Sequence, residues 1–291
     1  YRQREIKRLL ADTISYLQDA SKCPDGIAGI PTGFRDLDHM TGGLQRGDLI
    51  VIAGRPGMGK TALAMNIAEA VAIGAREAVA LFSLAQSDRV LMLRLLSSLS
   101  GIAHDRLRKG DITDEGVREK LALAVRQLVE APLDINDDLN LTVTDLHAQT
   151  RRLQEKRGAL GLILIDDLQM IEQDNPGNNR MTTVDRIMRS LKLLAREMYA
   201  PVIVLSQVSQ RAEQRANKRP LLADLPAAGA IEQHADVVLF IYRSEVYDPD
   251  SPERGIADIN IAKQRNGPIG TVKLAFQAEY LRFGDLASGY D

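Results

Sequence analysis

A glycine-rich segment, Gly54-Arg55-Pro56-Gly57-Met58-Gly59-Lys60-Thr61, carries the residues best suited to chemistry in this 291-residue chain. It fits the pattern G-x-x-x-x-G-K-[ST], and it lies between an apolar run at 48–53 and a helical pattern that extends to about residue 74. In this strand–loop–helix setting, backbone N–H groups and the positive end of the helix surround phosphate groups. The segment therefore predicts a phosphate-binding loop for ATP, against the alternative of a chance glycine-rich turn.

Two side chains at the end of this loop and one acid elsewhere have distinct expected roles. Lys60 would lie on the β- and γ-phosphates, and the Thr61 hydroxyl would ligate Mg²⁺. The metal also needs a carboxylate at the end of a neighbouring strand, and the apolar run at 160–165 ends on Asp166. Such an acid is common after α/β strands and gains its meaning from the loop. We therefore expect ATP and Mg²⁺ as cofactors.

A polar side chain that senses the γ-phosphate is the third element that such a site needs. The apolar run at 201–205 ends in Ser206-Gln207. In a parallel sheet, Gln207 would emerge at the same edge as Asp166. The alternative is a solvent-exposed loop glutamine.

Apolar runs that alternate with helical patterns position these residues. The expected strands are 48–53, 78–82, 133–136, 160–165, 201–205 and 237–242, and the expected helices are 59–74, 88–100, 114–130, 144–156 and 184–198. This alternation predicts a mainly parallel sheet that is buried on both faces. The runs 255–263 and 270–276 then flank Asn266-Gly267, which is a hairpin signal. The expected fold is α/β, with an antiparallel hairpin at its C-terminal end.

The first residues of the chain predict a separate helix. Ile6, Leu10, Ile14 and Leu17 fall on one face of a helix within residues 1–20. Residues 21–28, with a proline and a glycine, read as a linker, so the main domain is expected at 29–291. The leading helix either folds onto its own domain or docks on a neighbouring subunit.

The overall composition excludes several classes of protein. The net charge of −2, the 4% aromatic content and the absence of tryptophan disfavour a strongly basic or aromatic surface for nucleic acid, so any such site must be local. The single cysteine excludes an intramolecular disulfide and a cysteine metal cage. The sequence holds no apolar run of about 18 residues, so we expect no membrane association and a cytoplasmic protein.

Taken with further segments, the P-loop is similar to that of a known family. The segments, in order along the chain, are 29–38 (GIPTGFRDLD), 82–84 (FSL), 165–169 (IDDLQ), 205–207 (LSQ), 231–236 (IEQHAD) and 263–271 (KQRNGPIGT). They resemble the RecA-like P-loop ATPase domain of bacterial and phage replicative DNA helicases, the DnaB family. The resemblance covers residues 27–284, and its last segment is the most specific, because general RecA-type recombinases lack it. Residues 1–20 resemble the family's linker helix, which packs on an adjacent subunit.

The resemblance implies a homo-hexameric ring that encircles single-stranded DNA and translocates 5′ to 3′ as it hydrolyses ATP. Lys263 and Arg265 match residues that reach the γ-phosphate of a neighbouring subunit, where a cation neutralises charge on the transferred phosphoryl group. The alternative for this pair is a solvated hairpin edge. A helicase loader and a primase are further candidate partners.

Loops that face the central channel contact DNA in this family. They match residues 172–182 and 210–229, and the second segment contributes a local basic patch. Its candidate DNA-binding residues are Arg211, Arg215, Lys218, Arg219 and Gly229. A few cations and backbone N–H groups would give binding that is salt-sensitive and independent of sequence. The alternative is an ordinary charged surface loop.

Two departures from the family pattern put turnover in doubt. Ala85 stands where the family has a glutamate that orients the attacking water, and such a base is typically worth about 10²–10⁴-fold. Pro226 lies where the family has an Arg-Glu pair, and a proline removes a backbone donor as well as a cation.

Three functions follow as alternatives. The leading hypothesis is an ATP-driven helicase motor. The second is a nucleotide-gated DNA-binding ring that hydrolyses little ATP, and Ala85 favours it. The third is a RecA-type repair or recombination ATPase that forms filaments, which the segment 263–271 argues against. No acceptor-substrate site supports a metabolic kinase.

Overall fold

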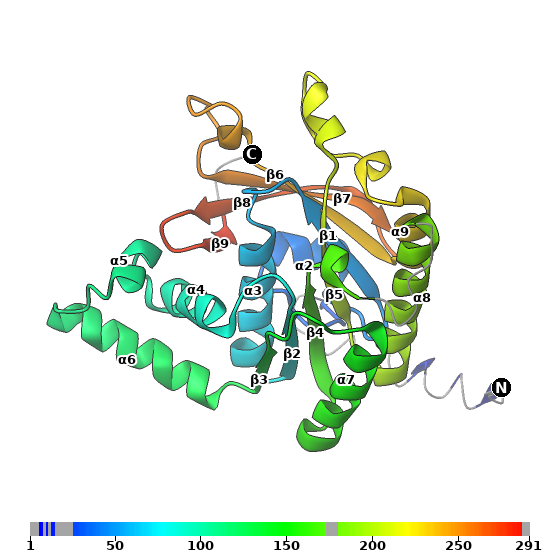
Figure 1. Cartoon of the computed structure of the whole chain (residues 1–291), viewed down its shortest axis with the longest axis horizontal. Coiled ribbons are helices and arrows are strands. Elements are labelled where there is room, and N and C mark those ends of the chain that lie inside the picture. The colour runs from blue at the N-terminus through cyan, green and yellow to red at the C-terminus, as the bar shows by residue number, and fades with distance from the viewer. Residues whose placement is uncertain (1–5, 8–9, 11–12, 15–25, 173–179, 287–291) are drawn as a thin grey trace.

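The computed structural model describes residues 6–7, 10, 13–14, 26–172 and 180–286. A nine-stranded sheet forms its centre (Figure 1). The strands are β1 (Leu49–Gly54), β2 (Ala78–Ser83), β3 (Leu133–Asn136), β4 (Leu160–Asp166), β5 (Val202–Gln207), β6 (Val237–Tyr242), β7 (Ile256–Gln264), β8 (Gly270–Gln277) and β9 (Arg282–Asp285). The helices are α2 (Arg35–Thr41), α3 (Lys60–Glu69), α4 (Asp88–Ser100), α5 (His104–Lys109), α6 (Glu115–Glu130), α7 (Val143–Arg157), α8 (Arg180–Met198) and α9 (Ala228–His234).

The strands lie in the order β3-β2-β4-β5-β1-β6-β7-β8-β9. The first six are parallel, and they are the six apolar runs that the sequence predicts. The last three are antiparallel, and residues 265–269 with Asn266-Gly267 connect β7 to β8. The predicted α/β fold with a C-terminal antiparallel addition is therefore confirmed.

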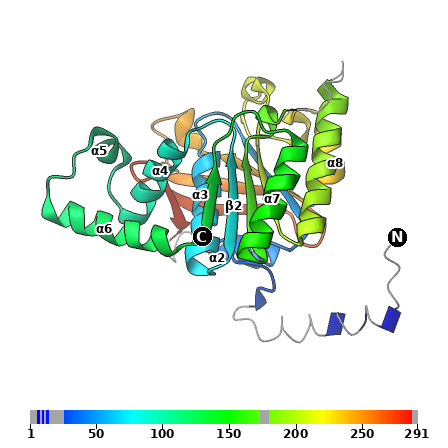
Figure 2. The same cartoon turned by 60° about the horizontal axis from the view of Figure 1, so that its bottom comes forward.

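Alternation along each central strand divides the core into two layers. In β1, Leu49 and Val51 face the layer that contains α7 and α8, whereas Ile50 and Ile52 face the layer that contains α2, α3 and α4. Figure 2 shows these helices on opposite sides of the sheet. Because side chains on a strand alternate between its faces, a run that is apolar at every position must be covered on both sides.

Several short elements escaped the sequence-based predictions. Helices α2, α5 and α9 have six or seven residues each, too few to give a helical period that stands out from its surroundings. Strand β9 has four residues and pairs with β8. The predicted helix at 59–74 is observed as α3 followed by a π-helical turn at Ala70–Gly74.

The predicted N-terminal helix lies mostly outside the described residues. Of its apolar stripe, Ile6, Leu10 and Ile14 are described, are helical and are each more than half exposed. The proposed boundaries at residues 20 and 28 remain predictions. No helix in the described ranges is long and apolar enough to span a lipid bilayer.

The carboxyl group of Glu69 is largely buried where α3 meets α4. Its Oε2 accepts a hydrogen bond of 2.9 Å from the Ser98 hydroxyl, and Oε1 is buried with no hydrogen-bond partner among the described residues. Burial raises the pKa of Glu69 from 4.5 to about 7, although the Ser98 hydrogen bond and the Arg282 charge oppose the rise. The folded protein therefore binds more protons here than the unfolded chain between these two values.

Glu69 gives a prediction for stability against pH. Because its folded pKa is raised, the free energy of unfolding should fall as the pH rises from about 4.5 to about 7. Glu69→Gln should remove this fall and be the more stable protein at about pH 8, by a few kcal/mol at most, since one pKa unit corresponds to about 1.4 kcal/mol. Thermal melts at about pH 5 and about pH 8 measure the effect, with Glu130→Gln at the exposed end of α6 as the control. Equal pH dependence of Glu69→Gln and the unaltered protein would contradict this role.

Candidate nucleotide site and subunit edge

The P-loop, residues 54–61, connects the end of β1 to the start of α3. Gly57 and Gly59 have φ of 82° and 100°, a region that favours glycine. A Cβ atom on Gly59 would also lie 3.0 Å from the Phe283 ring. The first N–H groups of a helix have no acceptor within the helix, so those of α3 are available to an anion. This geometry fits the phosphates of a nucleotide.

The Lys60 ammonium lies inside the loop. Its Nζ donates hydrogen bonds to the carbonyl oxygens of Gly54 at 2.9 Å and Arg55 at 3.2 Å. Burial lowers the pKa of Lys60, and the charges of Asp166 and Asp167 oppose this change. The cation is therefore held where the loop would surround a phosphate group.

Thr61 and Asp166 meet at the end of β4. The Thr61 hydroxyl donates a hydrogen bond of 2.9 Å to Asp166 Oδ2. Burial raises the pKa of Asp166, with the Asp167 charge adding to it, whereas the Thr61 hydrogen bond, Lys60 and Arg94 oppose the rise. A hydroxyl and a carboxylate at this separation are oxygen ligands of the kind that Mg²⁺ takes, directly or through water. The residues present therefore fit a magnesium ion.

Arg94 of α4 was not singled out from the sequence. Its charge acts on Asp166, and its Nε is buried with no hydrogen-bond partner in the described part of the chain. Burial lowers its pKa, and Asp166 opposes this. The spacing of residues gave no signal for Arg94, because it belongs to an ordinary amphipathic helix.

Gln207 lies beside the P-loop, at the sheet edge where the sequence places it. Gln207 is paired with Gly54 in the register of β5 and β1. Its side-chain Nε2 donates a hydrogen bond of 3.2 Å to Asp167 Oδ2, and Gln169 Nε2 donates one of 3.0 Å to Ser206 Oγ. Asp167 and Gln169 thus hold the end of β5 against the end of β4.

Ala85 lies just beyond the end of β2, at the same edge. Ser83, the last residue of β2, pairs with Asp166, and Ala85 is exposed two residues further on. Ala85 therefore follows the strand that pairs with β4, whose end carries Asp166, and its exposed position leaves room for a longer side chain.

Arg243 contacts the P-loop from just beyond the end of β6, and no sequence motif singled it out. One guanidinium nitrogen donates a hydrogen bond of 3.1 Å to the Gly57 carbonyl oxygen. The guanidinium pairs with Glu245 and lies 4.2 Å from the centre of the Phe276 ring. Phe276 in turn packs on Phe283, the ring that touches Gly59. Strands β8 and β9 of the antiparallel addition, which carry these two rings, therefore pack against the P-loop.

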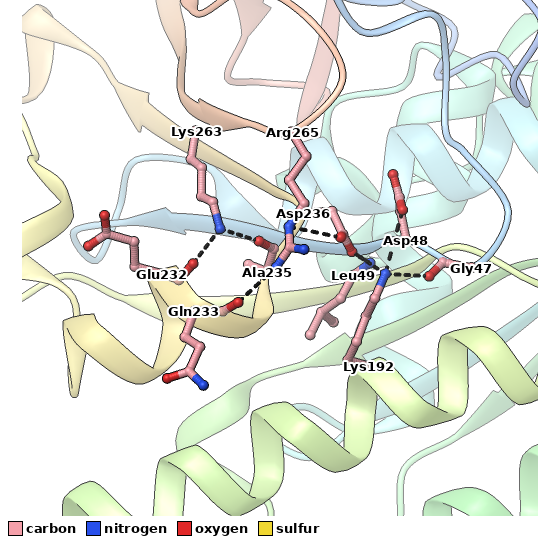
Figure 3. Close-up of polar contacts among 10 residues, drawn as sticks. All are labelled: Gly47, Asp48, Leu49, Lys192, Glu232, Gln233, Ala235, Asp236, Lys263 and Arg265. Atoms are coloured by element: carbon pink, nitrogen blue, oxygen red, sulfur yellow. Dashed lines mark hydrogen bonds and ion pairs between the residues drawn. The ribbon is translucent and has the colours of Figure 1, made fainter.

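Lys263 and Arg265 lie at the opposite edge of the sheet, and Figure 3 shows their side chains beside Gln233 and Asp236. Arg265 N–H donates to the Asp236 carbonyl oxygen, and Asp236 N–H donates to that of Leu49, the first residue of β1. The P-loop begins at the other end of β1, and at about 3.3 Å per residue the six-residue strand is on the order of 20 Å long. The two cations therefore cannot reach the phosphates bound by their own P-loop.

The candidate DNA-binding cations are mostly held by contacts within the chain. Arg215 pairs with Asp224, Arg219 pairs with the buried Asp258, and the Lys218 ammonium lies 4.7 Å from the centre of the Tyr247 ring. Arg211 is exposed, and no ion pair of its side chain is seen within the described residues. The four residues thus differ in how free they are to contact a phosphate.

The segment that carries these cations also contacts the P-loop. Arg55 Nε pairs with Glu213 at 2.9 Å, and its Nη1 donates a hydrogen bond of 3.0 Å to the Val208 carbonyl oxygen. A groove of about 660 Å³ lies between them, lined in part by Arg55, Gln207 and Pro226. Gly229 is exposed in the first turn of α9. Of the other candidate segment, residues 173–179 lie outside the described ranges.

The strand order, the P-loop and Asp166 at the end of β4 together define a RecA-like α/β ATPase domain. The profile of the family described as "DnaB-like helicase C terminal domain" matches residues 29–285. The chain therefore belongs to this family.

Similar proteins include "Replicative DNA helicase DnaB" of Geobacillus stearothermophilus, 46% identical over 99% of this chain. "Replicative DNA helicase DnaC" of Bacillus subtilis is 44% identical over the same share. The chain spans 63% of the length of each relative.

Two solved structures have the same fold. One is described as an ATPase domain, and it has a TM-score of 0.92 and 34% identity and covers 98% of this chain and 100% of its own. The other shows a DnaB-like replicative helicase and its interactions with primase, with a TM-score of 0.89 and 34% identity over 98% of this chain and 68% of its own.

The contact between Arg243 and the Gly57 carbonyl gives a prediction for nucleotide affinity. Arg243→Met removes a hydrogen bond from a charged donor, worth about 1.5–3 kcal/mol. We expect the dissociation constant of a fluorescent ATP analogue to rise by about tenfold or more. Arg254→Met, at an exposed position near the same strand ends, is the matched control. An affinity within about twofold of the unaltered protein, with the melting temperature retained, would show that this contact does not shape the P-loop.

Proposed function

We propose that this chain is the ATP-driven motor domain of a replicative DNA helicase. One observation supports it most: the P-loop, Asp166 and Gln207 converge at one sheet edge in a chain that belongs to the DnaB-like helicase C-terminal family over residues 29–285. Lys60, Thr61 and Asp166 hold MgATP, and Gln207 senses the γ-phosphate. Bound Mg²⁺ supplies charge neutralisation on the phosphate oxygens.

The active form under this proposal is a homo-hexameric ring around single-stranded DNA, moving 5′ to 3′. The distance between the P-loop and the opposite sheet edge supports an inter-subunit site, because Lys263 and Arg265 can serve only the phosphates of another subunit. Arg211 and the backbone near Gly229 contact the DNA, and Arg215, Lys218 and Arg219 shape the segment around them. The name of one structural neighbour supports a primase as a partner. A helicase loader is a further proposed partner, and the cytoplasm the proposed compartment.

Lys60→Ala tests the motor function. This change removes the cation from the P-loop, so ATP turnover and strand displacement on a forked duplex with a free 5′ tail should both fall to background. Lys120→Ala, at an exposed position of α6, is the control and should leave both unchanged. ATP turnover that neither responds to single-stranded DNA nor accompanies unwinding would rule out a motor.

A nucleotide-gated DNA-binding ring with little hydrolysis is the second candidate. The exposed Ala85 at the phosphate edge favours it, because no carboxylate stands there to orient water. Family membership argues against the third candidate, a RecA-type filament ATPase, and electron microscopy separates rings from filaments.

Ala85→Glu distinguishes the first two candidates. If hydrolysis lacks only a general base, restoring a carboxylate at position 85 should raise steady-state ATP turnover by about 10²–10⁴-fold. Ala85→Gln is the matched control, since it has nearly the same size and cannot accept a proton, and it should give no such gain. Equal turnover of Ala85→Glu and Ala85→Gln would show that the missing base does not limit hydrolysis.

A further inference from the structure

A buried carboxylate, Asp236, lies between the end of α9 and the start of β6 at the sheet edge opposite the P-loop (Figure 3). Its Oδ2 accepts hydrogen bonds from Leu49 N–H at 2.8 Å and from Lys192 Nζ at 2.5 Å. Its Oδ1 lies 3.3 Å from Arg265 Nε. A carboxylate taken out of water in this way needs the positive charges beside it. Asp236 is thus bound to the sheet, to α8 and to one of the two trans cations.

Lys192 of α8 is the second fixed charge of the cluster. Besides Asp236 it donates a hydrogen bond of 2.7 Å to the Gly47 carbonyl oxygen, and it lies 3.6 Å from Asp48 Oδ1. Its side chain is about one-fifth exposed, whereas that of Arg265 is about one-half exposed. Lys192 therefore neutralises Asp236 from inside, and Arg265 does so from the solvent side.

The last carbonyl groups of α9 hold the two trans cations. Lys263 Nζ donates to the carbonyl oxygens of Glu232 and Ala235, and Arg265 Nη2 donates to that of Gln233 at 2.8 Å. The final carbonyls of a helix have no partner within it, so they accept from cations. Both side chains are therefore hydrogen-bonded to carbonyl oxygens at the C-terminal end of α9.

The two helices of this cluster begin at the candidate DNA-binding segments. Helix α8 begins at Arg180, within the candidate segment 172–182, and α9 begins at Ala228, within the candidate segment 210–229. His234 of α9 also lies 2.9 Å from Asp185 of α8, so the two helices are joined at a second point. Helices α8 and α9 are therefore linked to each other near the place where Lys263 and Arg265 are held.

From these contacts we infer that Asp236 and Lys192 are positioning residues for the two trans cations. The Asp236 carboxylate fixes the position from which the Arg265 side chain would extend toward the neighbouring subunit. Lys192 remains hydrogen-bonded to Asp236 after Arg265 has moved away, so the buried carboxylate keeps one cationic partner. This inference rests on the proposed function, in which Lys263 and Arg265 act in trans.

Mixed rings test the inference. Asp236→Asn should lower ATP turnover by about tenfold or more, because a small misplacement of a charge-stabilising group has effects of that size. Nucleotide binding by its own P-loop should remain unchanged. Lys60→Ala subunits cannot use their own site but carry intact trans cations. An equal mixture of Asp236→Asn and Lys60→Ala, with single-stranded DNA present, should therefore exceed the summed turnover of the two separate proteins.

The reference mixture is Arg265→Ala with Lys60→Ala, and all mixtures are measured in this chain and in the Ala85→Glu chain. If the reference mixture gains turnover and the Asp236→Asn mixture does not, Asp236 acts within its own subunit and the inference is overturned. If the reference mixture fails as well, trans delivery itself is wrong, and both the inference and that part of the proposed function fall. The motor function itself is tested separately by Lys60→Ala alone. If this variant cannot unwind DNA although the reference mixture fails, trans delivery is wrong and the motor function stands.

A second variant guards against loss of folding. Lys192→Met keeps Asp236 and Arg265 paired but removes the inner charge, and it should behave as Asp236→Asn does in the mixtures. Arg189→Met, at an exposed position of the same helix, is its matched control and should match the unaltered chain. Lys192→Met rings with turnover equal to the control would overturn the positioning role.

Discussion

The parallel register of β1, β4 and β5 is the constraint on which the rest of the structure depends. In a parallel sheet all carboxyl ends lie along one edge, so Gly54, Asp166 and Gln207 come together although more than 40 residues separate each from the next. The close hydrogen bond between Thr61 and Asp166 is the result. A change of register by one residue would turn these side chains to the other face and bury apolar ones wrongly.

The same constraint separates the P-loop from Lys263 and Arg265. Strand β7 runs antiparallel to β6, so its last residues return to the edge where β1 begins. The extent of β1 then keeps both cations away from the phosphates of their own chain. In the proposed function the P-loop at one edge of the sheet binds the phosphates, and Lys263 and Arg265 act from the other edge. Such a site forms only where the second edge of one subunit meets the P-loop of another. The geometry of a single chain thus favours a repeating assembly, which is the physical basis of the proposed ring.

Strong local patterns made most of the fold predictable from the sequence. The six predicted strands became the six parallel strands. Five of them are apolar over most of their length and mainly buried, and β3, with the sequence LDIN and half-buried positions, lies at the outer end of the strand order. The pair Asn266-Gly267 predicted the hairpin, and the pattern G-x-x-x-x-G-K-[ST] predicted the P-loop. Arg243 and Arg94 were not predictable, since their roles come from contacts between residues far apart in sequence: Arg243 meets Gly57, and Arg94 acts on Asp166. The ion pairs of Arg215 and Arg219 were not predictable either, because their partners Asp224 and Asp258 lie 9 and 39 residues further along the chain.

Binding and turnover make different demands on this site. The P-loop, Thr61 and Asp166 are all held by the sheet of one chain, so the proposed MgATP site needs no residue from another subunit. Under the proposed function, turnover also needs a positioned water and a further cation on the transferred phosphate besides Lys60. Ala85 provides no carboxylate for the water near the end of β2, and in the proposed function the further cation comes from another subunit. A chain of this design can therefore hold a nucleotide firmly while its rate of hydrolysis is decided by one side chain and by its neighbour.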